Sequence, residues 1–115
     1  MSKYAPMNKK VKAKWVKALR TGGYKQGRGK LCTPPDHDGG DHSFCCLGVL
    51  ENLYCLEKNL SFKNFHYSKH STKAAVWSGV SRGLLFGDAA DLLVEKNDYS
   101  GWGFKRIATW IEKNL

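Results

Sequence analysis

The sequence predicts a single α+β domain over residues 1–115, mainly helical with one short β-hairpin. Apolar residues recur at helical spacing in several separate segments, which is the first observation for this fold class. A Gly- and Pro-rich stretch between the first two of these segments favours extended chain and turns. The length suits one domain whose core needs no cross-links.

The first helix is expected over residues 8–20, after a flexible tail over residues 1–7. Asn8 is a suitable N-cap, and Gly22-Gly23 is a stop signal. Lysines cover the surface that the apolar stripe leaves, so the helix is amphipathic and basic. The stripe consists of Val11, Trp15, Ala18 and Leu19.

The hairpin is expected between this helix and a central one. Residues 24–33 form an extended segment that ends at Leu31-Cys32, and Pro34-Pro35 breaks it. The chain turns in a loop over residues 36–41, and Ser43-Phe44-Cys45 pairs back as the second strand.

The central helix is the strongest structural signal. The segment of residues 43–58 has almost no charge before Glu51. Its spacing of three and four predicts a wide apolar face and a largely buried helix. The residues at this spacing are Leu47, Leu50, Leu53, Tyr54 and Glu57.

The remaining half of the chain, residues 59–115, predicts a loop and three further helices. Residues 59–69 show no clear period, Ser71 can cap a short helix that carries Trp77, and Asp88 can cap another with Leu92 and Leu93 inward. Residues 97–101 have turn chemistry. The last helix presents one apolar face, made of Phe104, Ile107, Ala108, Ile111 and Leu115.

The charge balance indicates an anionic partner. Nineteen Lys and Arg against ten Asp and Glu give a net charge of +9. Such an excess suits nucleic acid, a nucleotide or an acidic protein, although solubility alone could also explain it. No apolar run has the length of a membrane span and no signal peptide is visible. We therefore expect a cytoplasmic protein with reduced cysteines and no membrane partner, and homo-oligomers stay open.

Cys46 offers one enzymatic alternative, because a thiol at a helix N-terminus favours the thiolate. The string Cys46-Leu47-Gly48-Val49 also resembles the start of the nucleophile helix in papain-like cell-wall peptidases. A cysteine hydrolase would need a histidine on a strand, and the downstream histidines, His66 and His70, lie in an expected loop. The alternative reading, a small buried core residue, is favoured.

Metal binding and cofactors are not expected. Cys32, Cys45, Cys46 and Cys55 lack the short spacing of a zinc knuckle. The acidic loop from Asp36 to His42 starts like a calcium loop but carries leucine at the twelfth position, so a solvated hairpin tip is favoured over a divalent cation site.

A basic and aromatic set is the main candidate site. Glycines at 22, 23, 27 and 29 would let backbone approach a ligand. Arg and Lys suit phosphates, whereas Tyr and Trp suit base stacking. Trp102 stands between glycines just before the last helix, and a helix N-terminus beside two cations favours an anion. The candidate ligand-binding residues are Arg20, Tyr24, Gln26, Arg28, Trp102, Lys105 and Arg106.

The order of these motifs resembles a family of small bacteriophage-encoded proteins without assigned chemistry. The most specific piece is Phe44-Cys45-Cys46-Leu47-Gly48-Val49-Leu50, and the Asn97-Asp98 pair before the last helix also fits. This chain departs by its insert at residues 36–41 and by Gly101-Trp102-Gly103. The resemblance implies a phage setting. By analogy of class, such a protein is similar to sponges that sequester nucleotide immune signals.

The leading hypothesis is therefore a non-enzymatic phage protein that sequesters a small phosphorylated, nucleotide-derived ligand in the host cytoplasm and so inhibits antiviral signalling. A basic accessory factor that binds nucleic acid or an acidic host protein through the first helix is the alternative, and a hydrolase using Cys46 is third. Salt dependence separates the first two, because binding to many phosphates weakens steeply with salt.

Overall fold

The computed structural model describes residues 7–28, 32–33, 42–59 and 88–115. These residues form four helices and a three-stranded sheet, so the chain is an α+β domain with a predominantly helical core, as the sequence predicted. The expected loop after residue 59, the helix capped by Ser71, the tryptophan at 77 and the acidic loop at 36–41 lie outside the described residues.

Helix α1 (Lys9–Thr21) follows the predicted pattern closely. The side chain of Asn8 accepts hydrogen bonds from the backbone N–H groups of Lys10 and Val11, which confirms it as the N-cap. Gly22 ends the helix, with its N–H donating to the Ala18 carbonyl at 2.8 Å. The buried face comprises Val11, Trp15, Val16, Ala18 and Leu19.

The sheet has three strands of two residues each, β1 (Lys25–Gln26), β2 (Cys32–Thr33) and β3 (Ser43–Phe44), in the order β1-β3-β2. The antiparallel β2–β3 pair is the predicted hairpin. The parallel β1–β3 pair was not predicted. It brings Gly27 so close to Ser43 that a Cβ at position 27 would lie 2.9 Å from the Ser43 Cβ, so this glycine serves the sheet.

Helix α2 (Cys46–Glu57) is the expected central helix. Cys45 caps it, and its sulphur accepts the Gly48 N–H at 3.3 Å. Leu47, Val49 and Leu50 are fully buried, which confirms the prediction of a helix inside the core.

Helices α4 (Asp88–Asp98) and α5 (Phe104–Asn114) complete the described core. All five predicted inward residues of the last helix are buried, from Phe104 to Leu115. The predicted turn over residues 97–101 is wrong at its start, because Asn97 and Asp98 belong to α4. Gly101, with φ +72°, supplies the reversal between the two helices.

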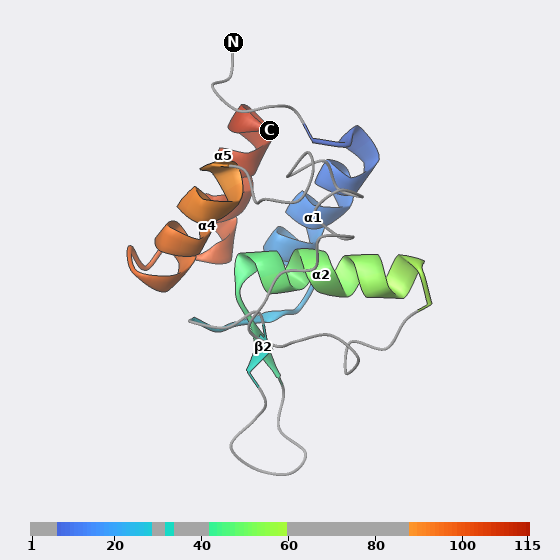
Figure 1. Cartoon of the computed structure of the whole chain (residues 1–115), viewed down its shortest axis with the longest axis horizontal. Helices are drawn as coiled ribbons and strands as arrows, with labels where there is room; N and C mark the ends of the chain where they lie inside the picture. The colour runs from blue at the N-terminus through green and yellow to red at the C-terminus, as the bar shows by residue number, and fades with distance from the viewer. Residues whose placement is uncertain (1–6, 29–31, 34–41, 60–87) are drawn as a thin grey trace.

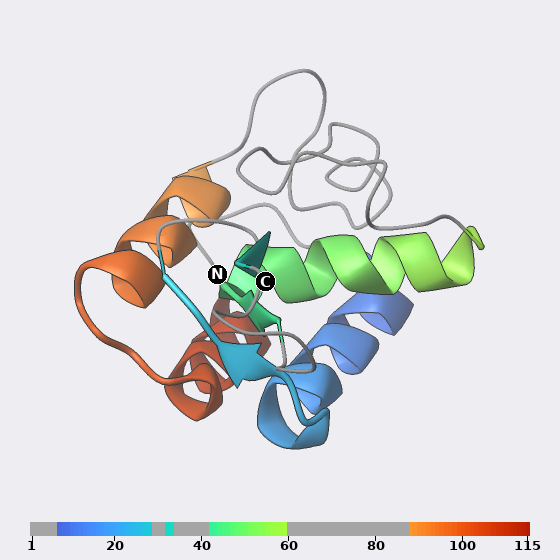
Figure 2. The ribbon, with the colours of Figure 1, turned by 90° about the horizontal axis from the view of Figure 1, so that it is seen from below.

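The helices form two layers around one core. Figure 2 shows α1 and α5 on one side of α2, and Figure 1 shows α2 crossing the lower end of α1 with the sheet below its first turn. Met7, which was assigned to the flexible tail, is buried instead, and its N–H donates to the Leu115 carbonyl at 3.1 Å. No helix within the described ranges has both the length and the apolar character that a membrane span requires.

Candidate functional site

The centre of the candidate site is Asn97, a polar side chain with no exposed surface. Its Oδ1 accepts the Cys46 N–H at 3.2 Å, at the first turn of α2. Its Nδ2 donates to the Gly27 carbonyl at 2.9 Å and to Asp98 Oδ1 at 2.8 Å. A buried amide with all these partners fixes three separate segments relative to one another.

Gln26 connects this amide to the α4–α5 loop. Its Nε2 donates to Asn97 Oδ1 at 2.9 Å and to the Trp102 carbonyl at 2.8 Å. The Trp102 N–H in turn donates to the Lys96 carbonyl at 3.0 Å and so closes the end of α4. Both backbone groups of Trp102, its N–H and its carbonyl, are therefore hydrogen-bonded, and these bonds fix the loop. A side chain on a fixed loop can bind a ligand at a lower entropic cost.

The indole of Trp102 lies among cations. The Arg106 guanidinium carbon is 4.1 Å from the ring centroid, and Lys96 Nζ is 5.2 Å from it. Both distances fit cation–π contacts. The ring is half-buried and packs against the core, so it presents part of its surface to solvent. We call Gln26, Lys96, Asn97, Trp102 and Arg106 the Trp102 cluster.

Two features adjoin the Trp102 cluster along the chain. Helix α5 starts at Phe104, and its N-cap residue, Gly103, has no side chain that could cap the first turn. The first turn of a helix carries N–H groups without partners inside the helix, and here Lys105 and Arg106, whose side chains are exposed, belong to that turn. Tyr99, in the loop between α4 and α5, is 84% exposed. Of the two large apolar side chains that are exposed in the described part of the chain, it is the more exposed one. Sequence reasoning missed Tyr99, although it stands only three residues before Trp102.

The structure brings three predicted site residues together, namely Gln26, Trp102 and Arg106. Lys105 is adjacent to Arg106 in the first turn of α5. Arg28 follows β1 and is exposed, with no ion pair to another described residue. It is close to the Trp102 cluster in sequence, two residues after Gln26.

Arg20 and Tyr24 serve other places. The Arg20 guanidinium donates to both carboxylate oxygens of Glu112, at 2.8 and 3.0 Å, and to Thr109 Oγ1 at 3.3 Å. Position 112 is ten residues beyond Trp102, which is roughly 15 Å along a helix. We therefore separate Arg20 from the Trp102 cluster.

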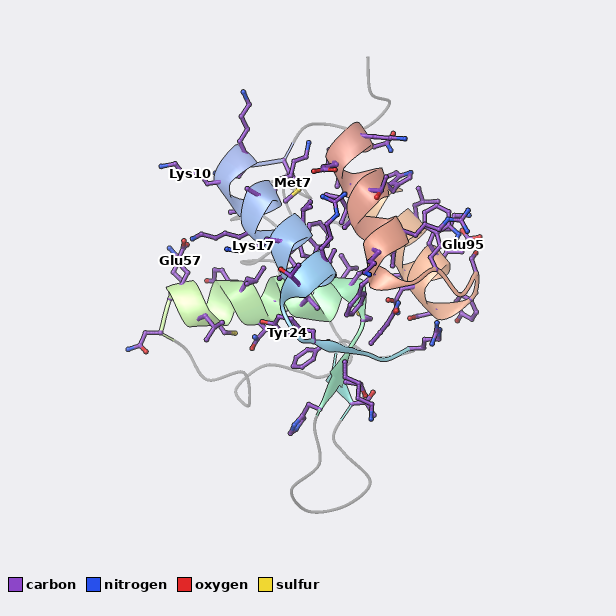
Figure 3. The ribbon with its side chains drawn as sticks, turned by 180° about the vertical axis from the view of Figure 1, so that it is seen from behind. Met7, Lys10, Lys17, Tyr24, Glu57 and Glu95 are labelled. Atoms are coloured by element: carbon purple, nitrogen blue, oxygen red, sulfur yellow. The ribbon has the colours of Figure 1, made fainter. Side chains whose placement is uncertain are left out.

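The Tyr24 ring is held between the sheet and α2. Its hydroxyl accepts a hydrogen bond from Asn52 Nδ2 at 2.6 Å, and its ring meets Phe44 edge-on at 5.1 Å. Figure 3 shows Tyr24 below the C-terminal end of α1. With its ring edge and its hydroxyl both engaged, Tyr24 supports the fold around β1.

Cys45, Cys46 and Cys55 belong to the core. Cys46 is fully buried, its Sγ contacts the Leu93 carbonyl at 3.7 Å, and its own carbonyl accepts the Trp15 indole N–H at 2.9 Å. Burial raises the pKa of Cys46 well above its ordinary value and raises the pKa of Cys45 to about 11. A helix N-terminus thus fails to give a thiolate here, because desolvation outweighs it.

These thiols make stability depend on pH in the alkaline range. The unfolded chain loses the Cys45 proton near the ordinary pKa of 9.0, whereas the folded protein keeps it to about 11. The contribution is complete below pH 9 and is lost as the pH rises toward 11. We expect Cys45 alone to lower the free energy of unfolding by roughly 1 kcal/mol between pH 8 and 10, measured by urea unfolding.

Cys45→Ser is the matched control, because serine keeps a capping atom for Gly48 and does not titrate in this range. Its stability should fall less steeply with pH than that of the wild type. Equal slopes in both proteins would contradict the assignment of the titration to Cys45.

No metal centre is visible in the part of the chain that the structure describes, where no three His, Cys, Asp or Glu side chains are grouped. Cys45, Cys46 and Cys55 are free thiols. The acidic loop considered for a divalent cation lies outside the described residues, apart from His42, which is exposed.

Fold and site together define a small, mainly helical α+β domain with a buried amide network under an aromatic-cationic loop. Residues 7–86 match the model of DUF8296, a domain of unknown function, and the chain belongs to this family. No curated protein and no solved structure matches the chain. The matched range contains Gln26, whereas the α4 and α5 residues of the Trp102 cluster lie beyond it.

Proposed function

We propose that this protein is a non-enzymatic binding protein that sequesters a small phosphorylated, nucleotide-derived ligand at the Trp102 cluster. The observation that carries the proposal is the half-buried Trp102 ring, which has the Arg106 guanidinium carbon 4.1 Å and the Lys96 ammonium nitrogen 5.2 Å from its centroid. An aromatic surface with fixed cations beside it suits a base that bears phosphates.

Each part of the Trp102 cluster has a role in this proposal. The base stacks on Trp102 in place of the looser Lys96 contact, while Arg106 stays on the ring. The freed ammonium, Lys105 and the first turn of α5, whose N-cap is Gly103, attract the phosphates. Tyr99 offers a second aromatic surface. The Trp102 cluster consists of amide, indole and cationic groups, and this composition supports binding more than turnover.

The biological setting is also a proposal. Resemblance to small bacteriophage proteins supports a phage protein in the cytoplasm of its bacterial host. A nucleotide-derived defence signal is the ligand that this setting favours, and its capture would block host antiviral signalling.

The test is a panel of cyclic and linear nucleotides, followed by tryptophan fluorescence and thermal melting. A ligand should change the fluorescence and raise the melting temperature. Trp102→Ala should keep the fold and weaken binding by about 1–3 kcal/mol, which is the usual cost of one lost base–aromatic stack. Trp110→Phe is the matched control, because it keeps the Trp102 signal.

A panel that gives neither a fluorescence change nor a melting shift would count against the proposal. If Trp102→Ala unfolds the protein, Arg106→Gln tests the same site at an exposed side chain. Unchanged affinity in Arg106→Gln would then show that the ligand binds elsewhere.

A further inference from the structure

A second feature of the surface is a groove of about 490 Å³ along α1, which Glu112 of α5 also lines. Figure 3 views the molecule from the side of these two helices, with Lys17 labelled. The groove shares no residue with the Trp102 cluster. Its volume lies in the usual range for binding pockets, roughly 300–1,000 Å³.

The groove is apolar in its floor and cationic at its rim. Ala13 and Val16 provide the floor from the middle of α1. Lys9, Lys12 and Lys17 provide ammonium groups at the rim, and their methylene chains add apolar surface. The rim also contains Arg20 and one acid, Glu112.

The negative charge of the acid at the rim is already balanced by an ion pair. Glu112 accepts two hydrogen bonds from Arg20, and this contact holds the pKa of the Glu112 carboxyl below its ordinary value. Lys12 Nζ donates to the Glu112 carbonyl at 3.0 Å. Lys9 and Lys17 make no ion pair with any described residue, so they are the cations left for a partner.

The spacing of these two lysines sets the geometry. Eight residues of helix separate them, which is ~12 Å along α1 at 1.5 Å per residue. The apolar floor lies between them, because Ala13 and Val16 fall between positions 9 and 17. A helix that matches this surface carries acidic residues two turns apart with apolar residues between them.

We propose that this groove docks an acidic amphipathic helix of a partner protein. A helix in a groove uses its apolar face for contact and its flanking charges for orientation. Nucleic acid fits less well, because phosphate contacts need cations and gain nothing from an apolar floor. The inference goes beyond nucleotide binding and concerns a different face of the protein.

The test uses a synthetic helical peptide with glutamates at i and i+7 and leucines at i+3 and i+4, labelled for fluorescence anisotropy. We expect saturable binding, stronger than that of a scrambled peptide of the same composition. The double variant Lys9→Gln, Lys17→Gln should weaken it about tenfold or more. Lys10→Gln, Lys58→Gln is the matched control, because neither residue lines the groove, and it should stay within about twofold.

A second variant addresses the floor. Ala13 is exposed, so Ala13→Gln should preserve the helix. Because the substitution places a polar amide in the groove, it should weaken the binding of the peptide. The proposal is overturned if the scrambled peptide binds equally well, if both double variants lose equal affinity, or if duplex DNA binds more tightly than the peptide. Nucleotide affinity should not change in these variants, so a failure here is distinct from a failure at the Trp102 cluster.

Discussion

Replacing Asn97 by leucine should lower the free energy of unfolding by about 3 kcal/mol. The substitution keeps the number and branching of the side-chain heavy atoms at a fully buried position but removes the amide. The Cys46 N–H and the Gly27 carbonyl would lose their Asn97 partner, and Gln26 Nε2 would lose one of two acceptors. Buried donors and acceptors without partners each cost about 1–3 kcal/mol. Urea unfolding followed by circular dichroism measures the change.

Asn52→Ala is the matched control for the loss of one amide contact. Asn52 is half-buried and, among the described residues, donates one side-chain hydrogen bond, to Tyr24, so we expect a loss of about 1 kcal/mol. Asn97→Asp keeps an acceptor for Cys46 but places a carboxylate beside Asp98 in a buried position, and it should also destabilise. A loss below about 1 kcal/mol in Asn97→Leu would contradict the central role of this amide.

The hydrogen-bond network couples stability to the candidate site. Gln26 touches Asn97 with the same nitrogen that holds the Trp102 carbonyl. A change at Asn97 therefore reaches the loop that carries the indole through a single side chain. This arrangement explains why Trp102 occupies a turn between two glycines: its backbone closes α4, while its ring is left beside Lys96 and Arg106.

The helices were predictable from the sequence because their signals are local. The 3.6-residue period of α1 and α5 marks the buried face of each, and Asn8 marks the start of α1. The run of leucines in α2 required a buried helix in a chain of this length. Propensity, pattern and caps agree at these places, which is the condition for a reliable prediction.

The remaining features depend on contacts between distant residues. Asn97 has the local chemistry of a turn. Its partners far away in sequence, the Cys46 N–H, the Gly27 carbonyl and Gln26 Nε2, make a buried place favourable for it. The parallel β1–β3 pair has two residues per strand, too few for any period. Charge alone placed Arg20 with Trp102, whereas its partner, Glu112, could be identified only from the packing of α1 on α5.

Deleting residues 88–115 should abolish the cooperative fold, even though the family match ends at residue 86. The segment supplies Leu93, Phe104, Ile107, Ile111 and Leu115 to the core. At about 1.5–3 kcal/mol for each large apolar side chain, the loss is roughly 10 kcal/mol, as much as the whole stability of a typical domain. Far-UV circular dichroism and urea unfolding of the shortened chain measure the effect.

Two further proteins make the result interpretable. Ile107→Ala removes one fully buried side chain from the intact protein and should cost about 2–5 kcal/mol, whereas Lys113→Ala, on the exposed side of the same helix, should cost less than about 0.5 kcal/mol. A peptide of residues 88–115 added in trans should restore part of the helical signal, because the apolar face of α1 lacks its cover without α5. A cooperative urea transition in the fragment of residues 1–87 would show that this fragment buries enough surface by itself, and it would contradict the role of α4 and α5 in the core.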